Sequence, residues 1–95
     1  MKIFTYTIKY RYGLDMHYAI QLTSAAWKVE SDCTVTKGDK TVSLKSSAGI
    51  LSLCARCGDT VTFTINGPDE DTALALIEEA VETPPDYDQN AFSDQ

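Results

Sequence analysis

The chain has 95 residues, of which 43% are hydrophobic and 23% charged, a composition typical of one globular domain with a single modest core. No apolar run approaches the roughly 20 residues of a membrane-spanning helix, so we expect no membrane role. The net charge of -6 is uneven: residues 1–66 carry +3, whereas residues 67–95 carry nine acids and no base. This distribution lacks the basic footprint of a nucleic-acid-binding protein.

The N-terminal residues and the cysteines both indicate the cytoplasm. Residues 1–6 alternate like a strand and lack the apolar core and cleavage site of a signal peptide. The three cysteines are Cys33, Cys54 and Cys57, and an odd count without a secretion signal indicates reduced thiols rather than a disulfide framework. We therefore expect a cytoplasmic protein.

The first predicted elements are a strand and a helix. Residues 2–10 alternate between apolar and polar side chains, which is typical of a half-buried strand. Asp15 is a suitable N-cap for the segment that follows it. Residues 16–29 form the predicted helix, because apolar residues recur there at helical spacing, at Ala19, Leu22, Ala26 and Val29, with Met16, Ile20 and Trp27 widening or flanking this stripe.

A hairpin and a short helix come next. Residues 33–37 and 40–44 are predicted strands, joined at Gly38-Asp39, where a glycine in the first central position favours a type II′ turn. Residues 46–53 are compatible with about two helical turns.

The last predicted elements are a strand and an acidic helix. Residues 60–65 alternate β-branched and aromatic side chains, as strands do. Asp69, Glu70 and Asp71 place negative charge where a helix N-terminus favours it. The helix that follows is expected to bury one apolar stripe, formed by Ala73, Leu74, Ile77, Ala80 and Val81.

The predicted order is βαββαβα, and helices with one apolar face each require a partner layer. We therefore expect an α+β two-layer open-faced sandwich, with the helices on one face of a four-stranded antiparallel sheet. Residues 1–82 form the predicted domain. Residues 83–95 are acidic, with Tyr87 and Phe92 as the large apolar side chains, and we expect a disordered tail there.

Two segments carry a resemblance to a known family. One is Gly13-Leu14-Asp15-Met16-His17-Tyr18-Ala19-Ile20-Gln21-Leu22, and the other is Leu44-Lys45-Ser46-Ser47-Ala48-Gly49-Ile50-Leu51-Ser52-Leu53. Together they resemble HPr, the small phosphocarrier of the sugar phosphotransferase system, and the match continues without gaps to about Val81. The resemblance implies the same element order, with the fourth strand between the first and the second. It also implies a carrier or regulatory protein rather than an enzyme, and no cofactor.

The resemblance also shows a departure at the family's phosphoacceptor. The family pattern runs Gly-aliphatic-His-x-Arg-Pro-Ala, so Asp15 stands at the position of the phosphorylated histidine, His17 at that of the arginine and Tyr18 at that of the proline. We interpret Asp15 as a helix N-cap, with an aspartyl phosphate or a permanent negative charge as the other interpretations. His17 is the only histidine, and a phosphohistidine there is the alternative to an exposed substitute for arginine.

A second position of the family is retained. Leu44-Lys45-Ser46 matches the serine that, in HPr of low-GC Gram-positive bacteria, a dedicated kinase modifies; Ser46 is also a plain N-cap candidate. The partners implied are enzyme I, the serine kinase and catabolite control protein. The expected partner-binding surface consists of His17, Tyr18, Ser47, Ala48, Ile50 and Leu51.

The spacing Cys54-Ala55-Arg56-Cys57 offers a thiol or metal alternative. Structural zinc requires four ligands, and the chain adds only Cys33 and His17 to this pair, so we expect no metal site. Cys33 is expected to be a small apolar residue of a strand. Three hypotheses follow: a regulatory or protein-binding domain without the phosphoacceptor histidine, an active phosphocarrier that uses His17, and a thiol or metal module based on Cys54 and Cys57.

Overall fold

A computed structural model describes residues 1–83 and residue 85. The order of elements is that predicted, βαββαβα. The strands are β1 (Lys2–Thr7), β2 (Asp32–Lys37), β3 (Lys40–Ser43) and β4 (Thr60–Asn66). The helices are α1 (Met16–Ala26), α2 (Ser47–Ser52) and α3 (Glu70–Glu82). The expected tail lies, apart from Thr83 and Pro85, outside the described residues.

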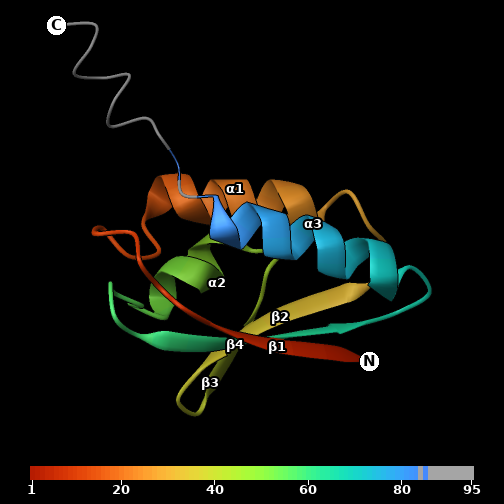
Figure 1. Ribbon diagram of the computed structural model, residues 1–95, viewed down its shortest axis with the longest axis horizontal. Coiled ribbons are helices and arrows are strands. Elements are labelled where there is room, and N and C mark those ends of the chain that lie inside the picture. Colours follow the sequence, from red (N-terminus) through yellow and green to blue (C-terminus); the bar gives the residue numbers. More distant parts are fainter. Residues whose placement is uncertain (84, 86–95) are drawn as a thin grey trace, which may run out of the picture.

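The four strands form one antiparallel sheet in the order β1-β4-β2-β3, and the three helices cover one of its faces (Figure 1). Strand β4 lies between β1 and β2, as the resemblance implied, and its alternation buries Val61, Phe63 and Ile65 on the helix side. The opposite face of the sheet is polar, since its registered pairs are mostly threonines, such as Thr5 with Thr62. This arrangement confirms the predicted two-layer sandwich.

Two predicted elements extend three residues beyond the observed ones, for local reasons. Strand β1 ends at Thr7 rather than at Tyr10, because its partner β4 begins at Thr60; Ile8 then pairs only with the turn before β4. Helix α1 ends at Ala26, and the N–H groups of Lys28 and Val29 bond three residues back instead of four. The chain therefore tightens into a 3₁₀-type turn at this end.

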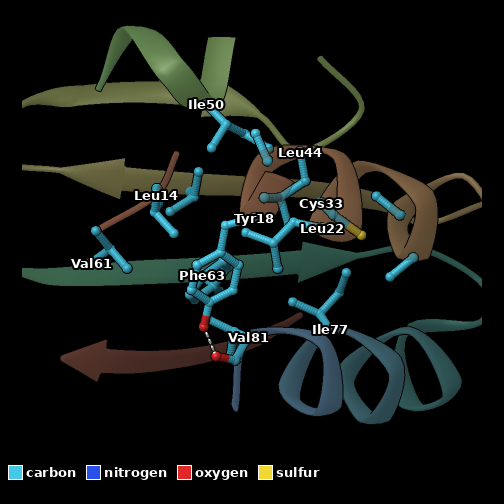
Figure 2. Close-up of a cluster of buried hydrophobic side chains, with 14 of the residues drawn as sticks. Leu14, Tyr18, Leu22, Cys33, Leu44, Ile50, Val61, Phe63, Ile77 and Val81 are labelled. Atoms are coloured by element: carbon cyan, nitrogen blue, oxygen red, sulfur yellow. Dashed lines mark hydrogen bonds between the residues drawn. The ribbon is translucent and has the colours of Figure 1, made fainter. Parts of the chain in front are cut away.

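The core lies between the two layers and is nearly closed to solvent. Figure 2 shows Tyr18 and Leu22 of α1, Phe63 of β4, and Ile77 and Val81 of α3 turned toward one another. The stripe predicted for α1 is buried as expected, and so is Cys33, which is 2% exposed. Burial raises the pKa of the Cys33 thiol, so this cysteine is a neutral, small apolar group.

Candidate functional site

The loop before α1 depends on a glycine that no other residue can replace easily. Gly13 has a φ of +67°, and a Cβ there would lie 2.4 Å from the carbonyl oxygen of Ala55. The N–H of Leu14 donates to that same oxygen at 3.0 Å. The segment after α2 is therefore packed directly against the loop before α1, and this contact fixes the position of Asp15 at the start of the helix.

Asp15 is the N-cap of α1, as predicted. Its backbone is extended, and its carboxylate oxygen accepts the N–H of Tyr18 at 3.0 Å. The backbone carbonyl of Asp15 accepts the first helical bond, from Ala19, at 2.8 Å. The carboxylate thus satisfies one of the helix N–H groups that would otherwise be open to an external anion.

His17 lies in the first turn of α1 and is exposed to solvent. It is placed two residues after the cap, on the helix itself, and it borders a groove between α1 and α3. Asp15 and His17 are thus neighbours at the N-terminal end of α1. No third carboxylate or thiol joins them, since no group of three or more potential metal ligands exists in residues 1–83 and 85.

Tyr18 is buried, so the prediction that it belongs to a partner-binding surface is wrong. Its side chain is 1% exposed and packs edge-to-face against Tyr10, with ring centroids 5.5 Å apart. Its hydroxyl donates to the backbone carbonyl of Val81, the dashed line in Figure 2. The reason is its position on α1: Tyr18 lies beside Ala19 and Leu22 on the face that meets the core. Burial raises the pKa of the phenol well above its usual value.

Ile50 is the second correction to the predicted surface. It is fully buried because it is the residue of α2 that faces the core. Of the remaining positions, Ala48 is exposed, while Ser47 and Leu51 are half-buried.

Ser46 is the N-cap of α2. Its side-chain oxygen accepts the N–H of Gly49 at 3.0 Å, and its backbone carbonyl accepts the N–H of Ile50. The residue is exposed, so the hydroxyl is available to a modifying enzyme as well as to its own helix. Lys37 and Lys40 close the other end of α2, since their ammonium groups donate to the carbonyls of Ser52, Leu53 and Cys54.

Trp27 connects the end of α1 to the residue before Ser46. Its indole N–H donates to the carbonyl of Lys45 at 3.1 Å, and the Lys45 ammonium lies 5.3 Å from the ring centroid. The end of α1 thus lies near the start of α2, and Leu14 before α1 bonds to Ala55 after α2, so the two helices run antiparallel. Asp15 and Ser46 lie near opposite ends of α1, an 11-residue helix about 16 Å long.

The exposed face of α1 carries large apolar side chains that the sequence analysis placed at the border of the buried stripe. Met16 is 51% exposed, Ile20 50% and Trp27 65%. The signal for a second, outward stripe was present in the spacing, because positions 16, 20 and 27 fall on one side of a helix, away from Ala19 and Leu22.

The two spaced cysteines are exposed free thiols. Cys54 follows α2 directly and has a φ of +54°, a left-handed conformation usually taken by glycine. The Cys57 thiol donates to the carbonyl of Lys9 at 3.7 Å. No described residue completes a metal site with this pair.

Comparison with known proteins agrees with the geometry. A family model described as the PTS HPr component phosphorylation site matches residues 3–83. The chain is 36% identical over 75 residues to the phosphocarrier protein HPr of Cupriavidus necator, a match that covers 75% of this chain and 84% of that protein.

Two solved structures are similar over most of their length. HPr of Thermoanaerobacter tengcongensis superposes with a TM-score of 0.82 at 34% identity, covering 86% of this chain and 92% of that one. The Bacillus subtilis catabolite repression protein Crh, described as a domain-swapped dimer, superposes with a TM-score of 0.69 at 31% identity, covering 79% and 86%. None of the helices described here is long and apolar enough to cross a membrane.

The family model covers most of the chain, and the sequence of an HPr protein is 36% identical to it. These matches show that the chain belongs to the HPr family of the phosphotransferase system.

Proposed function

We propose that this HPr-family chain is a cytoplasmic regulatory or protein-binding domain that does not carry a phosphoryl group at its first-helix site. The observation that supports this most directly is the cap of α1. Asp15, at the family's phosphoacceptor position, uses its carboxylate to accept the N–H of Tyr18. An anionic phosphoryl group there would meet a fixed negative charge and one fewer open N–H donor.

The neighbouring residues support the same proposal. Imidazole suits phosphoryl transfer because it is a good nucleophile near neutral pH and a good leaving group afterward. His17 has this chemistry, but it lies within the helix, two residues beyond the position next to the cap amides. The family's arginine, which would offer a planar set of donors to phosphate, is the residue that His17 replaces.

The proposed partner-binding surface lies on the exposed side of α1. Met16, Ile20 and Trp27 expose apolar area along α1. Helix α2 contacts α1, and we include its exposed Ala48 and half-buried Leu51 in the proposed surface. Exposed tryptophans often dominate the affinity of protein interfaces. Enzyme I, the serine kinase and catabolite control protein are the partners to test, and the similarity to a catabolite repression protein favours a regulatory one.

Ser46 is the proposed regulatory phosphorylation site. Its hydroxyl is exposed at the first position before α2, and a phosphate there would change the charge at one end of the α1–α2 surface. Incubation with ATP and the cognate serine kinase, followed by intact-mass analysis, should add one phosphoryl group. The Ser46→Ala variant should stay unlabelled, and Ser47→Ala, one residue further, should be labelled normally. Wild-type protein that stays unlabelled by an active kinase would remove Ser46 from the proposal.

The main experiment tests phosphoryl transfer from phosphoenolpyruvate through enzyme I. The wild type should gain no acid-labile phosphoryl group, whereas the double variant Asp15→His/His17→Arg should gain one, because the scaffold around Gly13 is that of the family. Circular dichroism checks that both proteins are folded. Labelling of the wild type that His17→Ala abolishes would overturn the proposal and establish the His17 phosphocarrier.

A further inference from the structure

Helices α1 and α3 enclose an open groove on the side of the helical layer that faces away from the sheet. The groove has a volume of about 700 Å³. Its apolar lining is formed by Ile20, which is half-exposed, and by Leu76 and Ala80 of α3. The polar lining includes His17 and Lys28 on the α1 side and Glu79 on the α3 side.

The chain itself leads into this groove. Gln21 of α1 donates to the carbonyls of Ala80 and Thr83, which fixes the end of α3 against the middle of α1. Thr83 and Pro85 then line the groove. The ten residues that follow, 86–95, lie outside the described part of the chain, and they are attached to Pro85, which lines the groove.

The large apolar side chains of this C-terminal segment match the apolar lining of the groove. Residues 86–95 contain three aspartates and no base, and their large apolar side chains are Tyr87 and Phe92. Such a segment cannot build a core of its own and needs a surface on which to order. Of the charged lining residues, Lys28 favours the aspartates and Glu79 opposes them, so the match depends on the apolar side chains.

The reach of the segment is sufficient. An extended chain advances about 3.3 Å per residue, so two residues after Pro85 span at most about 7 Å, and a tyrosine side chain adds to this reach. Leu76 and Ala80 are four residues apart, about 6 Å along α3. Attachment at Pro85 also gives the segment an effective concentration in the millimolar range, so a weak contact is enough to keep it bound.

We propose that residues 86–95 dock intramolecularly in the groove between α1 and α3, with Tyr87 against Ile20 and Leu76. Docking covers His17 and Ile20, which also border the partner surface of the proposed function. In so far as that function holds, the segment competes with a partner for α1. The docking itself needs no partner and is tested without one.

The test is nuclear magnetic resonance of the full-length protein. We expect nuclear Overhauser contacts between the Tyr87 ring and the Ile20 and Leu76 methyl groups, unchanged on dilution. Tyr87→Ser/Phe92→Ser should remove these contacts and shift the amide signals of Ser24 and Leu76. Ile20→Ser should remove them as well, whereas Ile3→Ser, at an isoleucine that is also at least half-exposed but lies on the open sheet face, should keep them.

Three results overturn the proposal. Random-coil shifts and order parameters below about 0.6 throughout residues 86–95 of the wild type would show an undocked segment. Contacts that fade on dilution would show that a second copy occupies the groove. If the amide signals of Ser24 and Leu76 do not change in the Tyr87→Ser/Phe92→Ser variant, these two side chains do not occupy the groove. A failure of phosphorylation or partner binding, by contrast, would leave these contacts in place.

Discussion

The buried hydroxyl of Tyr18 gives the sharpest quantitative test of the structure. The carbonyl of Val81 lies in the last turn of α3, where backbone oxygens have no partner within the helix, and the Tyr18 hydroxyl is its donor. The Tyr18→Phe change removes only this hydroxyl and keeps the ring. The net hydrogen bond contributes about 1 kcal/mol, and a buried carbonyl left without a donor adds to the loss, so we expect a decrease of about 2 kcal/mol in the free energy of unfolding.

Urea denaturation followed by far-UV circular dichroism measures this change. In a domain of this size a loss of about 2 kcal/mol lowers Tm by roughly 8–16 °C. The matched control is Tyr12→Phe, because Tyr12 is 45% exposed and should change stability little. A Tyr18→Phe protein with the stability of the Tyr12→Phe control would refute the assignment of a buried hydrogen bond that joins α1 to α3.

The buried phenol of Tyr18 also predicts that the stability of the folded protein depends on pH in the alkaline range. Burial raises the pKa of Tyr18 in the folded protein, whereas an unfolded tyrosine loses its proton near pH 10. Above about pH 10 the folded state therefore holds a proton that the unfolded state has released, and stability falls as the pH rises. The Tyr18→Phe protein lacks this contribution, so its deficit relative to the wild type should shrink above about pH 10. A constant deficit across this range would contradict a buried phenol.

Three further variants test other local features. Gly13→Ala should lower the free energy of unfolding by more than about 2 kcal/mol, because a side chain would strain the backbone at positive φ and meet the Ala55 carbonyl. An unchanged midpoint of urea denaturation would contradict this contact. Cys54→Gly should raise stability by about 0.5–1 kcal/mol, since glycine takes the left-handed backbone without strain, and a loss would show that the thiol has a structural role. Donation from the Ser31 hydroxyl, then from the Glu30 N–H, lowers the pKa of Asp69, so stability should be lost as the pH falls below about 4. In thermal melts recorded from neutral to acid pH, the Tm of Asp69→Asn should fall less at low pH than the Tm of the wild type. Equal pH dependence of Tm in the two proteins would show that Asp69 does not cause the loss of stability in acid.

Much of the candidate site could be predicted from local patterns. Asp15 and Ser46 were identified as N-caps from residue type and position alone, because capping is a bond between near neighbours in the chain. The resemblance places Tyr18 and Ile50 on the partner-binding surface, but both side chains are buried. Which face of a short helix is buried depends on what the rest of the chain places against it.

The sequence by itself determined the family, the order of elements and the caps, because these depend on residue types and short-range spacing. Only the tertiary structure decided that Tyr18 joins α1 to α3, that Trp27 binds the residue before Ser46, and that the segment after α2 packs against Gly13. These contacts join residues 18 to 63 positions apart, and no periodicity specifies such pairs. They form because two layers close around one core, which fixes the distances between elements that are remote in the chain.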